Sequence, residues 1–343
     1  MGKTVGRSAS ATLRDVARLA DVHPGTVSRA LNPETRKLVN DETAQRVLEA
    51  AATLGYRPNP IARGLKTNRS YTVGVLVPDL MNPLFPPIVR GIQDKLEQAG
   101  YTPLIANTDN DRERERNDFE AMRARQVDGV ITATARLDHG VLDEMAAAGL
   151  PIVLVNRRVA DGTLPSATAD DHEGARLAVA HLAALGHTRI ALLGGPQELS
   201  TGRLRREGFF AGMAEAGLEV GPELAVFGAA FTEPEGARLC RELMTHYPTA
   251  IVAGNDLMAL GCYDVFLELG LHCPRDVSVI GFNDMPFSER FNPPLSTIRI
   301  PQYEIGAAAA ELLLEQLGQG ETTVRHVVLE PELVVRASTG SPR

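Results

Sequence analysis

The side chains best suited to chemistry lie near the N-terminus. His23, Thr26, Ser28 and Arg29 follow one another within seven residues. A guanidinium can donate two hydrogen bonds to O6 and N7 of guanine, while hydroxyl and imidazole groups can bind base edges or phosphates. Residues 1–70 carry 12 Lys and Arg against 6 Asp and Glu, although the whole chain has a net charge of −8. The acidic average therefore hides a basic segment suited to a phosphate backbone.

Sequence signatures of catalysis, cofactors and metals do not occur. The chain contains no GxSxG elbow, Walker loop, HExxH helix or GxGxxG fingerprint, and its Gly194-Gly195-Pro196 segment lacks the lysine of a phosphate-binding loop. The eight histidines share no ligand spacing with the cysteines. We therefore predict no enzyme, with no catalytic residues, no metal and no cofactor.

Cysteine usage and hydropathy indicate the compartment. Cys240, Cys262 and Cys273 form no CxxC pair and cannot all pair within one chain, which favours a reducing environment. The first thirty residues contain no apolar run of signal-peptide length, and no later apolar run reaches the ~20 residues of a membrane span. The sequence predicts a cytoplasmic globular protein of two or three folding units, with no membrane partner.

Short helices are predicted to position the basic side chains. Thr12 and Asp15 have the spacing of a capping box, so a first helix should run from there to about Ala20. After a short turn, His23 is a possible N-cap before Pro24, which suits the first position of a second helix. Two helices joined by so short a turn suggest a helix-turn-helix.

A third helix would complete a small core. Asn40 can cap it, and Gly55 can end it in a left-handed conformation. Its predicted apolar stripe consists of Val47, Leu48, Ala51 and Leu54. Residues 1–11 are expected to form a disordered arm, and residues 58–66 are too short and too rich in Gly and Pro for a stable isolated helix.

From Tyr71 onward, apolar segments alternate with amphipathic ones. The predicted strands are 71–77, 101–106, 129–133, 152–155, 189–193, 250–253 and 277–281. This alternation predicts parallel α/β sheets. A spacing of 117 residues also relates Val73 to Ile190, Gly91 to Gly208, Leu96 to Met213, Ala99 to Ala216 and Gly100 to Gly217. The repeat predicts two similar lobes with a ligand cleft at the carboxyl ends of their strands.

Four motifs follow one another along the chain: Thr12-Leu13-x-Asp15-Val16-Ala17, Thr26-Val27-Ser28-Arg29, Gly55-Tyr56-x-Pro58-Asn59 and Gly281-Phe282-Asn283-Asp284. In order and spacing they resemble the lactose-repressor (LacI/GalR) family of bacterial transcription regulators, over residues 12 to about 336. The resemblance implies an all-α helix-turn-helix headpiece, a hinge helix that folds on DNA, and an α/β sensor of two parallel-sheet lobes similar to periplasmic binding proteins. The expected domains are an arm (1–11), a DNA-binding domain (12–57), a hinge (58–70) and an effector-binding and dimerisation domain (71–343).

For the headpiece, the resemblance implies a second helix that enters the major groove of double-stranded operator DNA. The candidates for base contacts are His23, Thr26, Ser28 and Arg29, with Arg29 as the first choice for guanine. Thr12 is a further DNA-binding candidate, and Asn32, Asn40, Thr43 and Tyr56 occupy positions that the family uses for phosphate contacts. The alternatives are a solvated surface arginine for Arg29, a mere cap for His23 and exposed polar residues for the phosphate set.

Two positions depart from the lactose repressor. Pro24 and Gly25 stand where that repressor presents long polar side chains, and neither can donate a side-chain hydrogen bond. Sequence discrimination should therefore depend more on His23, Thr26, Ser28 and Arg29, or on DNA shape.

In the hinge, the resemblance implies that Leu65 wedges into a base step of the minor groove, with Asn59 and Ala62 lining that groove. Gly64 weakens intrinsic helicity by about 0.5–1 kcal/mol relative to alanine, which favours a hinge that orders only on DNA. The alternative is a plain linker, with Leu65 packed on the sensor.

For the sensor, the resemblance implies an effector site that mixes flat apolar faces with directional polar groups: Phe85, Asp109, Asn156, Thr201, Arg205, Phe231, Asn255 and Asn283. Sugars and related polyols need that mixture. Arg205 could clamp a carboxylate or phosphate, or hydrogen-bond neutral hydroxyls. The alternative is an ion pair with a neighbour such as Glu207. Asn283 replaces the aspartate of the lactose and purine repressors, which favours a sugar acid over a cationic ligand, while Leu84 and Leu199 disfavour a purine.

The sequence thus predicts an effector-responsive repressor of carbohydrate or sugar-acid metabolism genes, which binds a pseudo-palindromic operator as a homodimer. A small-molecule binding protein or an α/β enzyme without DNA function is the rival prediction. The rival explains residues 71–343 but leaves the basic headpiece unexplained. The sign of the effector's action and the formation of tetramers stay open at this point.

Overall fold

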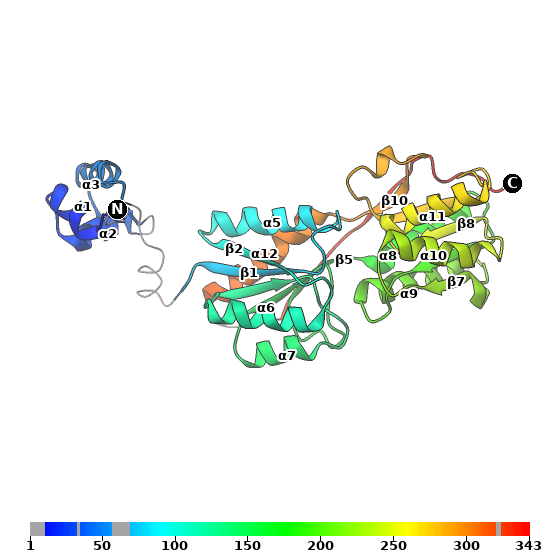
Figure 1. The fold of residues 1–343 in the computed structure, drawn as a ribbon, viewed down its shortest axis with the longest axis horizontal. Helices are drawn as coiled ribbons and strands as arrows, with labels where there is room; N and C mark the ends of the chain where they lie inside the picture. The colour runs from blue at the N-terminus through cyan, green and yellow to red at the C-terminus, as the bar shows by residue number, and fades with distance from the viewer. Residues whose placement is uncertain (1–10, 33–34, 57–68, 320–323) are drawn as a thin grey trace, which may run out of the picture. The chain divides into compact units, whose positions relative to one another are not determined.

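The structure is a computed structural model that describes residues 11–32, 35–56, 69–319 and 324–343. The chain divides into two compact units, Met1–Ser70 and Tyr71–Arg343. Both are drawn in Figure 1. None of the helices in the described ranges is long and apolar enough to cross a membrane.

The described part of the first unit is helical. Its elements are α1 (Leu13–Leu19), α2 (Pro24–Ala30), the 3-10 turn η1 (Arg36–Leu38) and α3 (Asp41–Thr53). The first two helices are separated by a short turn, as the helix-turn-helix prediction requires.

The predicted helix boundaries are confirmed by their caps. Thr12 Oγ1 accepts a hydrogen bond from the backbone N–H of Asp15, and the Asp15 carboxylate accepts one from Thr12 N–H, which completes the capping box. His23 Nδ1 accepts from the N–H of Gly25. Asn40 Oδ1 accepts from the N–H of Thr43. Gly55 follows α3 with φ 59°, in the predicted left-handed region.

The core of this unit is built largely from small side chains, and two predicted members are wrong. The buried residues are Val16, Ala17, Ala20, Val27, Ala30, Val39, Ala44, Val47, Ala50 and Ala51. Leu48 and Leu54 are instead 46% and 36% exposed. Leu48 lies about 100° around the helix axis from Val47, and Leu54 is the C-cap residue, where the helical face ends. The alanines of α3 allow the neighbouring helices to pack closely on a narrower face.

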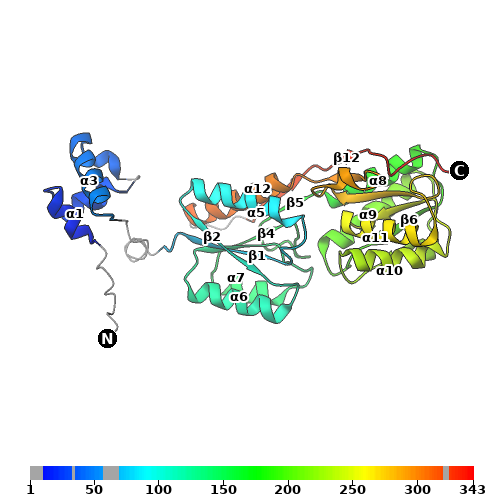
Figure 2. The same ribbon diagram turned by 45° about the horizontal axis from the view of Figure 1, so that its top comes forward.

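The second unit contains two six-stranded sheets, one in each lobe. The first-lobe sheet has the order β11-β5-β4-β3-β1-β2, with β1 (Thr72–Val77), β2 (Thr102–Asn107), β3 (Gly129–Thr132), β4 (Ile152–Val155), β5 (Ser166–Ala169) and β11 (His326–Leu329). Its neighbouring strands are parallel. Helices α5 (Phe85–Gln98) and α12 (Gln302–Gln319) cover one face, and α6 (Arg112–Ala124) and α7 (Gly140–Ala147) cover the other (Figures 1 and 2).

The second-lobe sheet has the order β12-β10-β9-β8-β6-β7, with β6 (Ile190–Gly194), β7 (Ala225–Phe227), β8 (Ala250–Ala253), β9 (Ser278–Asn283), β10 (Ser296–Arg299) and β12 (Glu332–Val334). Only the pair β10 and β12 is antiparallel among these described strands. Helix α8 (Asp171–Ala184) packs on α9 (Ser200–Glu215), and α10 (Glu233–Met244) packs on α11 (Asp256–Leu269). Two 3-10 turns, η2 (Pro222–Leu224) and η3 (Ser288–Arg290), complete the lobe.

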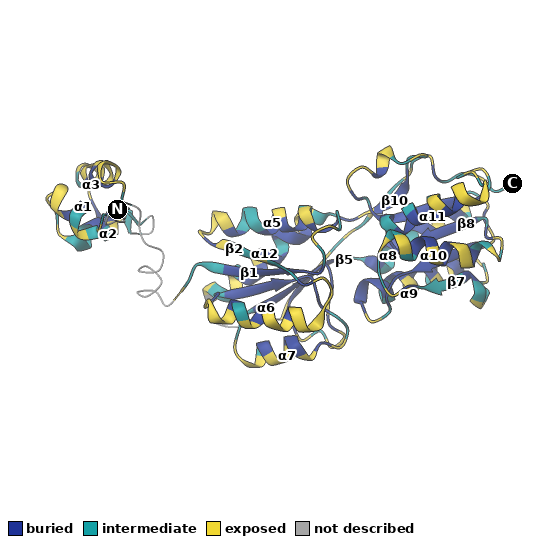
Figure 3. Cartoon of the chain, in the orientation of Figure 1, coloured by how far each residue is buried: buried dark blue, intermediate teal, exposed yellow. Residues whose placement is uncertain are grey.

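The chain passes between the lobes at separate points in the sequence. It leaves the first sheet after β5, returns from β10 into α12, and passes again between β11 and β12. The central strands are buried while the outer faces of the helices are exposed (Figure 3).

All seven predicted strands are present, whereas β5, β7, β10, β11 and β12 were not predicted. The missed strands have only three or four residues, and β11 and β12 are partly exposed. Segments this short carry little period-two signal, so pairing with longer strands defines them.

The predicted internal repeat is confirmed by equivalent packing in the two lobes. A β-carbon on Gly91 would lie 2.0 Å from the carbonyl oxygen of Tyr303, and one on Gly208 would lie 2.0 Å from that of His172. Each glycine thus allows close contact between paired helices, α5 with α12 and α9 with α8. Gly100 and Gly217 follow the two equivalent helices with φ of 77° and 69°.

Candidate functional site

Helix α2 presents polar side chains on the surface of the first unit. Val27 and Ala30 are buried in its core, whereas Thr26 and Ser28 are half-buried and Arg29 is exposed. A β-carbon on Gly25 would lie 3.9 Å from Arg29 Nη2, so the guanidinium lies close to the first turn of the helix. The polar residues predicted to read bases are therefore accessible near the N-terminal end of α2, as readout in a major groove requires.

Three of the predicted DNA-binding residues also serve as helix caps. Because Nδ1 of His23 accepts from Gly25, its neutral ring carries the proton on Nε2, which remains a donor. The hydroxyl of Thr12 donates to Asp15 Oδ2 over 2.6 Å. The side-chain oxygen of Asn40 likewise accepts the capping hydrogen bond from the N–H of Thr43. These caps hold the helix termini and use only the acceptor atoms of His23 and Asn40, not their side-chain N–H groups.

The remaining predicted DNA contacts divide into described and undescribed residues. Tyr56 packs against the core of the first unit, and burial raises its pKa, so its phenol stays a neutral donor. Asn32 follows α2, and its backbone carbonyl accepts hydrogen bonds from the N–H groups of Thr35 and Arg36. The hinge candidates Asn59, Ala62 and Leu65 lie outside the described residues.

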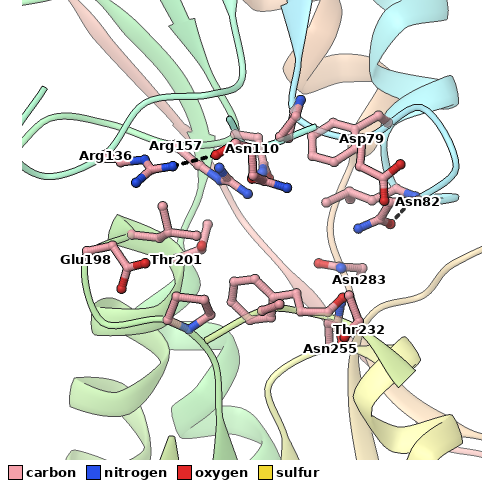
Figure 4. Close-up of a pocket in the computed structure, with 18 of the residues that line it drawn as sticks. Asp79, Asn82, Asn110, Arg136, Arg157, Glu198, Thr201, Thr232, Asn255 and Asn283 are labelled. Carbon is pink, nitrogen blue, oxygen red and sulfur yellow. Dashed lines mark hydrogen bonds between the residues drawn. The ribbon is translucent and has the colours of Figure 1, made fainter. Parts of the chain in front are cut away.

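A pocket of about 310 Å³ lies between the lobes of the second unit (Figure 4). Most of its lining residues follow the carboxyl ends of parallel strands, where ligands bind in open α/β sheets. From the first lobe they are Pro78, Asp79, Asn82, Leu84, Phe85, Asn110, Arg136, Asn156 and Arg157. From the second they are Pro196, Glu198, Leu199, Thr201, Arg205, Ala229, Ala230, Phe231, Thr232, Asn255 and Asn283.

Seven of the eight predicted effector residues line this pocket, and Asp109 does not. Asp109 lies in the turn after β2, where its carboxylate pairs with Arg114 and accepts a hydrogen bond from Asn107. Asp109 and Asn110 both have positive φ, 51° and 57°. This turn places Asn110 in the pocket instead, one residue beyond the predicted position.

Arg205 organises the floor of the pocket. Its Nε donates to Asp171 Oδ1 over 2.7 Å, its Nη1 to the carbonyl of Gly254 over 2.6 Å and its Nη2 to Asn283 Oδ1 over 3.2 Å. Its Cζ lies 3.7 Å from the centre of the Phe282 ring. Three of the five guanidinium N–H groups are thus used within the protein.

The predicted alternative partner of Arg205 is wrong, because Glu207 lies near Arg203 at 3.8 Å instead. The actual partner is Asp171 at the start of α8. Burial raises the pKa of Asp171, and the Arg205 guanidinium opposes that rise.

The asparagines of the pocket have different capacities for a ligand. Asn255 caps α11 through a bond from Met258 N–H, and its Nδ2 donates to the carbonyl of Phe231. The side-chain oxygen of Asn283 accepts a hydrogen bond from Arg205, so its amide N–H groups remain as donors at the pocket. Asn156 and Asn283 have φ of 65° and 110°, backbone conformations that commonly concentrate at functional sites.

The Phe231 ring lies over the backbone of Gly195. A β-carbon on Gly195 would lie 2.1 Å from a ring carbon of Phe231, so a larger residue there would displace the ring. Phe231 and Phe85 both line the pocket, but Phe85 is only 1% exposed and belongs to the hydrophobic core, so Phe231 provides the more accessible aromatic face.

Several pocket residues were not predicted, among them Asp79, Asn82, Asn110, Arg136, Arg157 and Glu198. Most lie within a few residues of a strand's carboxyl end, which is a signal available in the sequence. Arg157 immediately follows the predicted residue Asn156, two positions after β4. No cluster of three or more His, Cys, Asp and Glu side chains suited to a metal occurs in the described ranges.

Two family models match separate parts of the chain. Residues 12–59 match the model for "Bacterial regulatory proteins, lacI family", and residues 179–339 match the model for a periplasmic binding protein-like domain. The HTH-type transcriptional regulator RegA of Clostridium saccharobutylicum is 35% identical over 331 residues, covering 96% of this chain and 99% of the relative.

Two solved structures extend the similarity to three dimensions. The lac repressor dimer bound to operator and the anti-inducer ONPF matches with a TM-score of 0.82 and 29% identity, over 97% of this chain and 100% of that one. The complex of the transcriptional regulator CelR with cellobiose matches with a TM-score of 0.74 and 30% identity, over 96% and 99%. The chain therefore belongs to the lacI family of bacterial regulatory proteins, as a DNA-binding transcriptional regulator with a periplasmic-binding-protein-like sensor.

Proposed function

We propose that the protein is an effector-responsive repressor that binds a pseudo-palindromic operator as a homodimer and senses a sugar, sugar acid or related polyol. The observation that carries the proposal is the pairing, in one chain, of a helix-turn-helix with an exposed Arg29 and a polar interlobe pocket of about 310 Å³. The pocket volume lies within the range for small-molecule sites. The protein acts without catalysis, and we place it in the cytoplasm, where operator DNA lies.

The assignment of a sugar-like effector is supported by the lining of the pocket. Phe231 offers a flat apolar face, while Asn82, Thr201 and Asn283 offer hydrogen-bonding groups. Hydroxyl-rich ligands need both, because each hydroxyl requires partners and each C–H face requires apolar contact. The similar CelR structure is a complex with cellobiose, which is a sugar.

The proposed mechanism is a shift between two lobe arrangements. An effector that binds one arrangement more tightly changes the population of the two states by its differential affinity. In a dimer, the lobe arrangement sets the spacing of the two hinges and hence whether both headpieces fit one operator. The predicted base contacts are those of His23, Thr26, Ser28 and Arg29.

The proposal is tested by binding to DNA selected by the full-length protein from a random library. We expect a pseudo-palindromic consensus, and a linear fall of log affinity with log salt, because phosphate contacts release counterions. Scrambled DNA of equal length is the control. Selection that yields no consensus, with no salt-dependent binding to any duplex, would favour a sensor without DNA function.

A further inference from the structure

Arg157 carries a buried positive charge without a protein partner. It lies two residues after β4, is 7% exposed and lines the interlobe pocket. Its Nε is buried with no hydrogen-bond partner. Within the described part of the chain, its guanidinium forms no ion pair and no hydrogen bond. Buried charges in proteins are normally paired, so this arrangement points to a partner that comes from outside the chain.

None of the neighbouring carboxylates forms an ion pair with Arg157 in the described ranges, although Glu115 and Glu198 oppose the fall in its pKa and Glu198 lines the same pocket. Asp171 is paired with Arg205. Glu115 is buried against His139, whose Nε2 lies 3.0 Å from Glu115 Oε2. Burial, together with Arg136 and Arg205, lowers the pKa of Arg157 to about 10, so the side chain still carries its charge at neutral pH. Arg136 lines the same pocket and adds a second cation.

A second unpartnered polar atom lies across the pocket. The hydroxyl oxygen of Thr201, in the first turn of the 16-residue helix α9, is buried and has no hydrogen-bond partner. Hydrogen bonds between the lobes tie these regions together, since the N–H of Arg158 donates to Ser200 Oγ over 3.0 Å. Figure 4 shows Arg136 and Arg157 facing Thr201 and Glu198, away from the end that holds Asp79 and Asn82.

We propose that the effector carries an oxyanion, a carboxylate or a phosphate, which Arg157 binds together with the hydroxyl of Thr201. This inference rests on the proposed effector-sensing function and narrows its ligand class. A guanidinium fork and a hydroxyl donor suit an oxyanion, and the N-terminus of α9 adds the favourable end of a helix dipole. The neutral part of the effector then extends toward Asn82 and Asn283.

The same contact links ligand binding to lobe arrangement. Arg157 belongs to the first lobe and Thr201 to the second, so an oxyanion held by both stabilises the arrangement in which these residues face each other. A neutral ligand lacks that bridge and shifts the equilibrium less.

The decisive measurement uses inorganic phosphate and acetate as probes on the full-length protein, with chloride at equal ionic strength as the reference. We expect at least one of the two anions to raise the melting temperature of the wild type and of Arg158→Met, and not that of Arg157→Met. Arg158 is the matched control because it is the adjacent arginine, is exposed and does not line the pocket. Far-UV circular dichroism of Arg157→Met shows whether that variant is folded. Arg157→Lys, which keeps the positive charge, shows whether the anion-induced rise in melting temperature depends on that charge. Absence of an anion-specific rise in the wild type, or an equal rise in a folded Arg157→Met, overturns the proposal.

Calorimetry with matched ligand pairs then separates the two oxyanions. Ribose against ribose 5-phosphate tests phosphate, and glucose against glucuronate tests carboxylate. We expect the preferred acid to bind the wild type about 30-fold or more tightly than its neutral parent, and this preference to be lost in Arg157→Met. DNA binding by the wild type is measured separately. If the protein binds DNA but shows no Arg157-dependent anion effect, only the proposal of an oxyanion effector is refuted. If it shows the anion effect but binds no DNA, the proposed function as a DNA-binding repressor is refuted.

Discussion

Arg205 and Asp171 form a buried ion pair at 2.7 Å, between the interlobe pocket and the start of α8. Both side chains are almost completely shielded from solvent. The pair joins α9 to α8 within the second lobe. Arg205 also donates hydrogen bonds to the carbonyl of Gly254 and to Asn283 Oδ1. The pocket floor therefore depends on charge compensation by a residue that does not line the pocket.

Removing the carboxylate should destabilise the second unit. Asp171→Asn leaves Arg205 buried without its counter-ion, and we expect a loss of about 3 kcal/mol in unfolding free energy. Urea unfolding followed by far-UV circular dichroism measures it, since the chain has no tryptophan. Glu207→Gln is the control, because Glu207 forms only an exposed 3.8 Å pair with Arg203, and we expect less than about 0.5 kcal/mol there. Equal losses in the two variants would contradict the role of the buried pair.

The repeated glycines should be intolerant to a single added carbon. Gly91→Ala and Gly208→Ala each bring a β-carbon to 2.0 Å from a backbone carbonyl oxygen, so a packed helix pair must separate. We expect each to cost about 1–3 kcal/mol of stability. Gly140→Ala is the matched control at the start of α7, where a β-carbon meets nothing within 4 Å. Stability there should be unchanged or slightly raised, and similar melting temperatures for all three variants would refute the close packing.

Stability should fall with rising pH through the titration of Asp256. Burial raises its pKa to about 7 from 3.8, against opposing hydrogen bonds from Thr297 Oγ1 and the N–H of Met285. The folded state therefore binds the proton more tightly than the unfolded state between about pH 4 and 7. The stabilisation is present below pH 4 and is lost as the pH rises through 7, by up to about 1.4 kcal/mol per pH unit.

Asp256→Asn isolates this contribution, because asparagine does not titrate. Urea unfolding of the wild type and the variant at several values between pH 4 and 8 gives the difference in their stability. We expect the wild type to lose stability relative to the variant as the pH rises. A constant difference across this range would show that Asp256 titrates normally.

Arg29 should contribute to sequence discrimination. Arg29→Ala is expected to weaken binding to the selected operator by about 1–3 kcal/mol, through loss of a bidentate contact, and to relax the preference at one base pair. Arg29→Lys keeps the charge without the fork, so it should retain affinity for random DNA while losing the same preference. Fluorescence anisotropy with operator and random duplexes measures both quantities. A variant that loses affinity equally on both duplexes would assign Arg29 to phosphate contact.

Leu65 remains a prediction from the family resemblance, because it lies outside the described residues. If it wedges into a base step, Leu65→Ala should reduce specific affinity much more than affinity for random DNA, since only the operator complex contains the kinked step. A DNA-bending assay, based on the mobility of permuted fragments, should show a smaller bend. Equal losses on both DNAs, with an unchanged bend, would support the plain-linker alternative.

Local signals in the sequence predicted the caps at Thr12, His23 and Asn40 and the left-handed Gly55. Each of these depends on atoms two to five residues away, so neighbouring residue types are sufficient to specify it. The 117-residue repeat likewise predicted equivalent helices in two lobes, because a buried glycine and a terminal glycine have the same packing role in each. The family resemblance then indicated seven of the twenty residues that line the pocket.

Other features were decided only by the tertiary structure. The partner of Arg205 is Asp171, 34 residues away, rather than the nearby Glu207. Leu48 is exposed although its spacing suits a core position, because the face that packs is narrower than the apolar stripe. The chain crosses between the lobes at separate points, so segments far apart in the sequence surround a pocket residue such as Arg157. Those segments bury its Nε without providing a hydrogen-bond acceptor for it. Residue types and spacing therefore determined the helix caps, seven of the described strands and the family, whereas long-range packing determined the remaining strands and which buried charges are paired within the chain.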